Sequence, residues 1–397
     1  MVKRIDDPKR DPVIVAAKRT AVGKAPRGSF STTRPEDLAA YIIQDLLKET
    51  PQVEPKMLDD VLIGCAMPEG QQGLNMGRRI ALRAGLPVEV PAETINRFCS
   101  SGIQSIAHAA QGIMSGMIEI AIAGGVESMS MVPMRGIRMA PNPTLVAEYP
   151  NAYINMGLTA ENVAEEFNVS REDQDAFAAN SHVKAAAAQK ADRFQDEILP
   201  IEVELVTPNG TKKFMHHKDE GVRPDSTPES LARLRPVFKE GGTVTAANAS
   251  QMSDGAAGVI IMSLAKAEEL GLEPIARFIG YSVGGVRPEV MGIGPIAAIP
   301  KVLKQTGFTL DDMELIELNE AFASQALAVI REVGLNQEIT NVNGGAIALG
   351  HPLGCTGAKL SVQLLYEMQR RKNKFGMVSM CIGGGMGAAG IFENLKN

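Results

Sequence analysis

The stretch Leu58-Asp59-Asp60-Val61-Leu62-Ile63 recurs as Leu310-Asp311-Asp312-Met313-Glu314-Leu315. The second residue of each copy lies 40 residues before Cys99 and His351, respectively (99 − 59 and 351 − 311). After each copy, the sequence predicts a turn, a helix with apolar spacing and a strand that ends in a pair of glycines. Two similar halves that pack together would bring equivalent turns face to face. We therefore expect Cys99 and His351 to share one site.

Short β-branched runs alternate with longer helical patterns, which is typical of an α/β protein with buried, mainly parallel strands. The predicted strands are 13–17, 60–64, 118–123, 258–263, 276–283, 315–318 and 376–381. The predicted helices are 35–49, 101–115, 171–190, 295–305, 324–333 and 358–369. Proline-rich turns and polar runs mark an inserted segment at 127–245. The expected domains are a first half formed by 1–126 and 246–272, the insert, and a second half formed by 273–397.

Composition excludes several classes of function. The 397 residues include 40 Lys+Arg and 46 Asp+Glu, a net charge of −6 with no basic domain, which argues against nucleic acid as a partner. No apolar run approaches the roughly 18 residues that cross a bilayer, and the charged N-terminus lacks the apolar core of a secretory signal. The four cysteines form no CxxC pair and fit neither a zinc site nor a disulfide framework. We expect a cytoplasmic enzyme without a metal.

Cys99 precedes an amphipathic helix that begins near Ser101. Free backbone amides and the positive end of the helix dipole favour a thiolate at such a position, so the sequence predicts a lowered pKa for this thiol. The alternative is a small buried residue that fills a turn.

His351 lies in the glycine-rich run Asn343–Gly357. So many glycines around one histidine indicate backbone held close to a ligand or to other backbone, and such a histidine is a candidate general base. Its alternative is a structural loop histidine.

Two further residues end predicted strands. Cys381 is followed by Ile382 and three glycines, whose amides are candidate donors to an oxyanion, and Asn319 follows the strand 315–318. A buried inert cysteine and a helix cap are the alternative readings. Together, two thiols, an imidazole and glycine amides suit acyl transfer through a thioester. A second cysteine that exchanges a proton with carbon suits the cleavage or formation of a β-ketoacyl thioester.

These residues resemble the thiolase family, nearest to its bacterial degradative 3-ketoacyl-CoA members. The motifs that carry the resemblance are Asn96–Gly102, Gly124–Ser130, Asn319–Ala323, Gly344–Gly357 and Cys381–Gly387. The resemblance implies two similar βαβαβ-type halves, layered α-β-α-β-α, with a loop domain inserted in the first half. It also implies an acyltransferase of fatty-acid β-oxidation that takes coenzyme A as a co-substrate and has no permanently bound cofactor.

By the same resemblance, Cys99 is the acylated nucleophile, His351 its base, and Cys381 the proton donor and acceptor at the substrate α-carbon. Asn319, through a water, and His351 would bind the thioester oxygen. The amides of Cys99 and Gly383 would form a second oxyanion hole. A homodimer or homotetramer and an interacting β-oxidation enzyme are further implications.

Coenzyme A is expected along the inserted segment. The resemblance implies Arg223 at the adenine, with Phe238, Ala246, Ser250 and Met156 along the pantetheine. Basic side chains that could face the phosphates are Lys212, Lys213, His216, His217 and Lys218. The alternative is that these residues form a solvated loop that does not bind phosphate, since the carboxylates of Asp219 and Glu220 follow directly.

The reaction class leaves a close rival, an acetoacetyl-CoA thiolase that condenses two acetyl-CoA molecules. Members specialised for acetoacetyl-CoA have a histidine where this chain has Asn155, which favours the degradative class. Unbranched thioethers suit a deformable acyl pocket, though simple core packing is the alternative; the methionines concerned are Met129, Met131, Met134, Met139 and Met156. A ketosynthase would have His or Asn in place of Cys381, and a lipid carrier would need none of the three catalytic residues.

Overall fold

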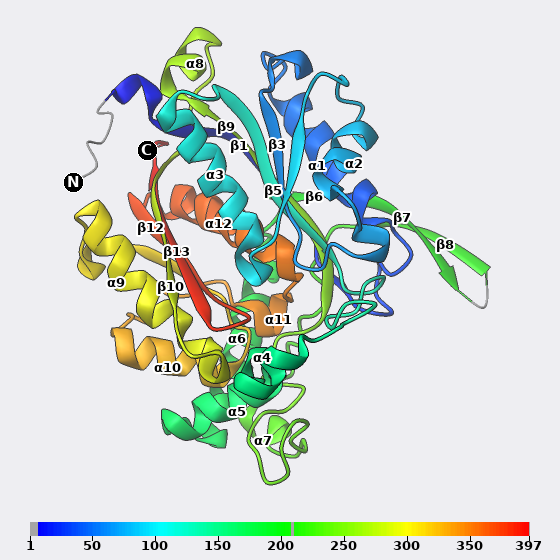
Figure 1. Ribbon diagram of the computed structural model, residues 1–397, viewed down its shortest axis with the longest axis vertical. Coiled ribbons are helices and arrows are strands. Elements are labelled where there is room, and N and C mark those ends of the chain that lie inside the picture. The colour runs from blue at the N-terminus through cyan, green and yellow to red at the C-terminus, as the bar shows by residue number, and fades with distance from the viewer. Residues whose placement is uncertain (1–6, 208–209, 397) are drawn as a thin grey trace.

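The computed structural model describes residues 7–207 and 210–396. Five layers follow one another across the molecule (Figure 1): helices α1 and α2, a first half-sheet, the paired helices α3 and α12, a second half-sheet, and helices α9 and α10. This is the α-β-α-β-α arrangement implied by the family resemblance. The two half-sheets meet where β1 and β10 pair antiparallel through Val13–Arg277 and Ile14–Ala276.

The strands of the main sheet follow the order β11-β12-β13-β10-β1-β9-β5-β3-β4. Their bounds are β1 Pro12–Thr20, β3 Asp60–Gly64, β4 Ala92–Ile95, β5 Ile120–Ser128, β9 Ser253–Ser263, β10 Ala276–Gly285, β11 Leu315–Leu318, β12 Phe375–Ile382 and β13 Met386–Asn394. Two short strands, β2 (Gly23–Lys24) and β6 (Ile198–Leu199), join the sheet at β9 and β1. The main helices are α1 Pro35–Glu49, α2 Met76–Arg83, α3 Ser101–Ser115, α8 Leu264–Glu269, α9 Gly294–Thr306, α10 Ala323–Val333, α11 Ala346–Leu349 and α12 Leu353–Arg371.

The two halves repeat one topology. In the first half, β9 pairs antiparallel with both β1 and β5, and β5 pairs parallel with β3. In the second half, β13 pairs antiparallel with both β10 and β12, and β12 pairs parallel with β11. Beyond β3 lies the parallel strand β4, and beyond β11 a parallel bridge joins Ile316 to Thr340. The internal repeat seen in the sequence is therefore a repeat of structure.

Alternating side chains along the strands fill three apolar cores. On β1, Ile14 faces α3 and α12, whereas Val13 and Val15 face α1 and α2. On β11, Leu315 faces the central helices and Ile316 faces α9 and α10. This period-2 pattern is what strands covered on both faces require.

The central helices approach each other closely at their N-termini. A Cβ atom on Gly102 of α3 would lie 2.5 Å from the backbone nitrogen of Ala358 in α12, and one on Gly125 of β5 would lie 2.2 Å from the carbonyl oxygen of Gly354. Only glycine permits these contacts. They bring the turn before α3, which contains Cys99, next to the turn before α12, which contains His351.

The segment between β5 and β9 spans residues 129–252. It forms α4 Pro143–Glu148, α5 Met156–Glu166, α6 Arg171–Lys190, the hairpin of β7 Ile201–Thr207 and β8 Gly210–His216, and α7 Pro228–Leu231. In Figure 1 these helices cover one end of the layered body, and the hairpin projects from its side. Short 3₁₀ turns complete the described chain at Pro8–Arg10, Pro55–Met57, Gly70–Gln72, Phe98–Ser100, Pro150–Tyr153, Pro288–Ile293 and Leu310–Asp312.

Several sequence predictions need correction. The strands are not mainly parallel, because β9 and β13 run antiparallel to both neighbours. Strand β13 was not predicted, since its small residues lack the β-branched pattern. The glycines Gly124-Gly125 lie inside β5, which continues to Ser128, whereas Gly383 follows β12.

The register of the repeat also differs from the predicted one. The backbone N–H of Asp59 donates to Ile120 O, and that of Glu314 donates to Phe375 O, so these two residues are structural equivalents. The Leu-Asp-Asp letters are thus shifted by three residues between the halves. The first copy runs into β3, whereas the second forms a 3₁₀ turn that precedes β11.

Candidate active site

Cys99 lies in a turn that is held by its own neighbours. Phe98 adopts a left-handed conformation with φ of +43°, and its N–H donates to the Asn96 side chain at 2.9 Å. The Ser101 hydroxyl donates to Phe98 O at 2.7 Å and accepts from the Arg97 N–H at 2.9 Å. Such a conformation persists only where surrounding bonds enforce it. These local bonds fix the position of the thiol ahead of α3.

The resting thiol is not a thiolate. Burial raises the pKa of Cys99 to about 11, although a backbone hydrogen bond from Gly383 opposes the rise. The sequence predicts a pKa below that of an ordinary buried thiol, and backbone amides do lower the pKa of Cys99, but removal from water outweighs them. An acceptor for the thiol proton is needed before Cys99 can attack.

His351 is oriented as such an acceptor. Its Nδ1 lies 2.6 Å from the Thr356 hydroxyl oxygen, and that hydroxyl donates its proton to Pro352 O at 2.8 Å. Thr356 therefore accepts from Nδ1–H, which leaves the lone pair on Nε2. Burial lowers the pKa of His351 to about 3, with a contribution from the Lys359 ammonium, so the ring is neutral at rest.

The turn that holds His351 depends on remote residues. Its backbone N–H donates to the Ser253 hydroxyl at 3.1 Å, and Met252 and His351 form a parallel bridge. The buried Glu127 carboxylate accepts the N–H groups of Gly354 and Ala66, both at 2.8 Å. Glu127 thus ties the start of α12 to the first half of the molecule.

Asn319 reaches the free nitrogen of His351. The Asn319 Nδ2 lies 3.4 Å from His351 Nε2, and the Asn319 Oδ1 is buried without a hydrogen-bond partner among the described residues. The adjacent Glu320 points away from the site, where its carboxylate accepts the Ser181 hydroxyl at 2.6 Å and the Asn341 amide at 2.9 Å. The Asn319 amide therefore lies within hydrogen-bond distance of the nitrogen that would accept the thiol proton.

Cys381 completes the group. It is fully buried near the end of β12, in contact with Met291 and Ala321. Burial raises its pKa well above the ordinary value, and the proximity of Cys99 raises it further. The Gly383 N–H is directed at Cys99. Cys381 and the Gly383 amide thus lie beside Cys99, and Asn319 lies beside His351, whereas the catalytic roles assigned to these five residues stay predictions.

Of the predicted coenzyme A residues, one begins helix α5 and the others lie in the loops before and after α7. Met156 begins α5 and packs near Cys381. Phe238 packs over the next residue, Gly157, where an added Cβ atom would lie 2.2 Å from the phenyl ring. The ring of Phe238 also meets Phe322 edge-on, with 6.4 Å between centroids. The Ser250 N–H donates to Ala321 O at 2.9 Å, and Ala246 is exposed nearby in the chain.

The side chain of Arg223 is exposed, and its backbone N–H donates to His182 Nδ1 at 3.1 Å. Burial, assisted by the Arg223 cation, lowers the pKa of His182 to about 4. The suggested phosphate-facing residue His216 is instead buried against Phe30, 4.7 Å between ring centroids. Lys213 on the projecting hairpin pairs with Glu204 at 3.2 Å.

The methionines divide into two groups. Met129 and Met134 pack in one cluster with Cys99 and Leu353, whereas Met139 is 59% exposed. Asn155 caps α5, its side chain accepting the Gly157 N–H at 2.9 Å. Apolar, unbranched side chains therefore border the nucleophile.

Sequence reasoning missed the supporting residues. Thr356, Glu127 and Ser253 each hold the His351 turn, yet only Thr356 is near it in the chain. The buried Cys65 and Cys355 are free thiols, as expected of packing residues. Glu127 lies in one of the family motifs, Gly124–Ser130, but the motif does not reveal that its carboxylate binds the start of α12.

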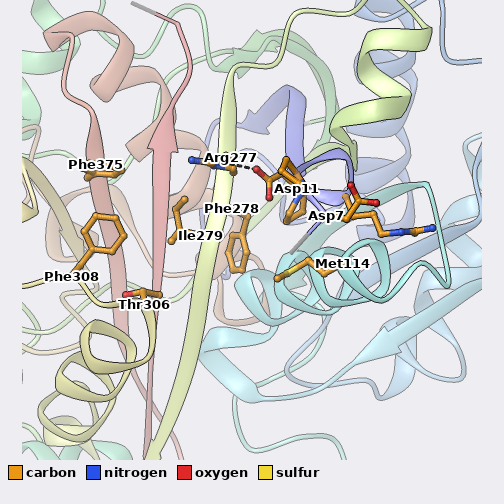
Figure 2. A pocket seen from close by; sticks show the side chains of 12 residues that line it. Asp7, Asp11, Met114, Arg277, Phe278, Ile279, Thr306, Phe308 and Phe375 are labelled. Carbon is orange, nitrogen blue, oxygen red and sulfur yellow. Dashed lines mark hydrogen bonds and ion pairs between the residues drawn. The ribbon is translucent and has the colours of Figure 1, made fainter. Parts of the chain in front are cut away.

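A separate groove of about 430 Å³ lies at the opposite end of the parallel strands, where β12 begins. Figure 2 shows the Asp11–Arg277 ion pair crossing it, between Met114 on one side and Phe308 on the other. Both charges are thus already paired. The groove is remote from Cys99, His351 and Cys381 in the fold.

Within residues 7–207 and 210–396, no helix has the length and apolar character of a membrane span. In the same part of the chain, no cluster of three or more His, Cys, Asp or Glu side chains could hold a metal ion.

Known proteins match the chain over almost its whole length. Residues 12–265 match the family "Thiolase, N-terminal domain", and residues 272–394 match "Thiolase, C-terminal domain". A 3-ketoacyl-CoA thiolase of Bacillus subtilis is 57% identical over 390 residues, covering 97% of this chain and 99% of the relative. An acetyl-CoA acetyltransferase of Chromobacterium violaceum is 47% identical, with coverage of 95% and 97%.

Among solved structures, the dimeric peroxisomal thiolase of Saccharomyces cerevisiae superposes with a TM-score of 0.89 at 42% identity, covering 99% of this chain and all of that one. The two domain matches meet between residues 265 and 272, where α8 leads into β10. With the gathered thiols and imidazole, these similarities establish that the chain belongs to the thiolase family.

Proposed function

We propose that this protein is a 3-ketoacyl-CoA thiolase, an acyltransferase that cleaves 3-ketoacyl-CoA with free coenzyme A during fatty-acid β-oxidation. The products are acetyl-CoA and an acyl-CoA shortened by two carbons. One observation supports the proposal most: the buried Cys99 thiol lies beside a second thiol, Cys381, and packs with Leu353, two residues after the neutral imidazole of His351. Similarity to the Bacillus subtilis 3-ketoacyl-CoA thiolase supports the substrate class.

The first half-reaction forms an acyl-enzyme. As Cys99 Sγ attacks the 3-keto carbon, His351 Nε2 takes its proton. The C2–C3 bond then breaks, the acyl group stays on Cys99, and the acetyl-CoA enolate leaves. Cys381 gives its proton to the enolate carbon and becomes a thiolate.

The second half-reaction releases the product. The Cys381 thiolate takes the proton of the coenzyme A thiol, and the resulting sulfur anion attacks the acyl-enzyme carbonyl. Cys99 leaves as a thiolate and recovers its proton from His351. Both cysteines and the histidine then return to their starting states. Burial raises the pKa of Cys381, so its thiol suits proton exchange with a carbon acid better than a thiol of ordinary pKa would.

Charge that develops on oxygen is stabilised at two points. The N–H groups of Gly383 and Cys99 serve the acyl carbonyl, and His351 with Asn319 serves the acetyl thioester oxygen. The convergence of Asn319 Nδ2 and His351 Nε2, 3.4 Å apart, supports the second assignment. The buried, unpartnered Asn319 Oδ1 also fits a site in which a small polar molecule bridges side chain and substrate.

Coenzyme A is the co-substrate, and we assign its binding to the inserted segment. In this proposal the halves, residues 1–126 with 246–272 and residues 273–397, supply the catalytic groups, and residues 127–245 supply most coenzyme contacts. We name residues 220–224 the nucleotide loop, with Arg223 at the adenine. Phe238, Met156, Ala246 and Ser250 follow the pantetheine toward Cys381. The contact of Met156 with the Cys381 cluster supports this direction.

The acetoacetyl-CoA thiolase remains the rival, and chain length separates the two. Flexible thioethers near Cys99, including Met129 and Met134, repack around ligands of different length with little strain. Each added CH₂ that is buried can contribute about 0.8 kcal/mol, mainly through KM. We therefore expect 3-ketoacyl-CoA longer than acetoacetyl-CoA to be cleaved at least as efficiently.

The decisive experiment measures kcat/KM for thiolysis from C4 to C16 3-ketoacyl-CoA. A steep fall from C4 to C8 would leave the condensing enzyme as the better reading. We also propose a homodimer, supported by the dimeric yeast relative, which light scattering after gel filtration tests. Four free, buried cysteines are consistent with action in the reducing cytoplasm.

A further inference from the structure

Gln251 joins two loops that are far apart in the sequence. Its Nε2 donates to Gly221 O at 2.9 Å and to Ile347 O at 3.1 Å, 30 and 96 residues away. Gly221 belongs to the nucleotide loop, and Ile347 belongs to the segment 344–351 that ends at His351, which we name the base loop. One carboxamide thus uses both of its N–H groups to connect the two.

The orientation of this carboxamide is determined by its surroundings. If the amide were reversed, its oxygen would face two carbonyl oxygens, which repel it. The Gln251 Oε1 is buried and accepts no hydrogen bond from the part of the chain that the structure describes. A group that leaves its own oxygen unpaired adds little net stability. The main structural consequence of Gln251 is therefore the link between the two loops.

The main chain of the same residue also contacts the base loop. Gln251 O accepts the Ser253 hydroxyl at 2.7 Å, and that hydroxyl accepts the His351 N–H at 3.1 Å. The carbonyl of Ile347 lies in the last turn of the short helix α11, where carbonyls lack helical partners. Gln251 therefore caps α11 and borders His351 at once.

No space separates the two loops. A Cβ atom on Gly221 would lie 2.6 Å from Ala348 O and 2.7 Å from Gln251 Nε2. Movement of the nucleotide loop toward or away from the body must therefore change the contact with α11. Since α11 directly precedes His351, such a movement is transmitted to the base.

We propose that Gln251 is a positioning residue that couples occupancy of the nucleotide loop to the alignment of His351. The inference rests on the proposed function, because it takes the 220–224 loop as the nucleotide site. Binding energy from the remote adenosine end of coenzyme A is thereby used to fix the base, which raises kcat and not only affinity.

The test compares two substrates that differ only in the nucleotide, 3-ketohexanoyl-CoA and 3-ketohexanoyl-pantetheine, with coenzyme A and pantetheine as the matching acceptor thiols. In the wild-type enzyme we expect kcat to be at least about tenfold higher with the coenzyme A pair. In Gln251→Met, which keeps the length and removes both donors, we expect that ratio to fall below about threefold.

Gln189→Met is the matched control. The Gln189 carboxamide makes a similar single bond to Asp219 O at 2.8 Å, and within the described residues it makes no hydrogen bond to the base loop. We expect this variant to keep the wild-type ratio of kcat values. If Gln251→Met does not fold, Gln251→Asn, which is too short to reach both carbonyls, replaces it, and melting temperatures are recorded for all variants.

A ratio that is unchanged in the Gln251 variant, or already near one in the wild-type enzyme, would overturn the coupling while leaving the thiolase assignment intact. A wild-type protein that cleaves neither substrate would instead overturn the proposed function and the inference with it. A loss of kcat that is equal for both substrates would indicate a purely structural role for Gln251 and also overturn the coupling.

Discussion

The turns that present Cys99 and His351 occupy equivalent places before α3 and α12, yet they are held in opposite ways. The Cys99 turn is fixed by Asn96 and Ser101, within three residues of the thiol. The His351 turn is held by Ser253, Gln251 and Glu127, through hydrogen bonds that span 96 to 227 residues. The first turn is held by local bonds, whereas the second adds these tertiary contacts to one local bond, from His351 to Thr356.

This difference matches the two roles in the proposed mechanism, Cys99 as nucleophile and His351 as base. The nucleophile needs a fixed position next to the amide of Gly383, and a strained φ of +43° at Phe98 supplies it. The base must be aligned with groups from several elements, Asn319 among them. Remote contacts suit the base, because they allow substrate binding elsewhere to influence it.

The largest expected effect tests the nucleophile. Cys99→Ala should lower kcat by about 10⁴-fold or more, since no acyl-enzyme forms. In the wild-type protein, supplied with acyl-CoA but no free coenzyme A, mass spectrometry with peptide mapping should find the acyl group on Cys99. An adduct on Cys381 with Cys99 unmodified would exchange the roles of the two thiols.

Cys381→Ser separates acylation from proton exchange with carbon. A serine hydroxyl is too weak an acid for this role, so thiolysis and condensation should each fall about 10²- to 10⁴-fold. Slow acylation of Cys99 should persist, because His351 and Thr356 are untouched. Turnover near the wild-type value would refute the assigned role of Cys381.

Thr356→Val tests the tautomer of the base. Loss of the 2.6 Å bond to His351 Nδ1 leaves a buried N–H unpaired, and kcat should fall roughly 10- to 100-fold. Thr356→Ser retains the hydroxyl and should restore most of the activity. The pH profile of kcat for the three proteins is the measurement, and equal losses for Val and Ser would point to packing instead.

Glu127→Gln and Ser101→Ala compare the remote and the local support directly. The amide cannot accept all the N–H groups that meet the carboxylate, so we expect about 2 kcal/mol of lost stability and a lower kcat. Ser101→Ala removes two local bonds, from the Arg97 N–H and to Phe98 O, and should cost about 1 kcal/mol. Urea unfolding measures both, and the reverse ranking would contradict the distinction between the turns.

The last prediction is a pH dependence of stability. Burial lowers the pKa of His351 in the folded protein to about 3, below its ordinary value of 6.5. The unfolded chain therefore binds more protons below pH 6.5, and stability that is complete above that pH falls by about 1.4 kcal/mol per pH unit toward pH 3. His351→Gln should flatten this slope in denaturant titrations at pH 7.5, 6 and 5. An identical slope would show that other groups dominate.

Many elements were predictable because their signals are local. The predicted helices 35–49, 101–115 and 171–190 coincide with α1, α3 and α6, since apolar periodicity and end signals lie within each segment. Strand β13 escaped prediction, because its small residues gain their strand character only by pairing between β10 and β12.

The sequence by itself determined the repeated α/β organisation, the Cys99 turn and the residues that gather at the site. Only the tertiary structure decided the protonation states of Cys99 and His351, because burial depends on every layer of the fold. It also decided which remote groups hold the base, Glu127 and Gln251 among them, since hydrogen bonds across such separations in the chain leave no periodic or local pattern in the sequence.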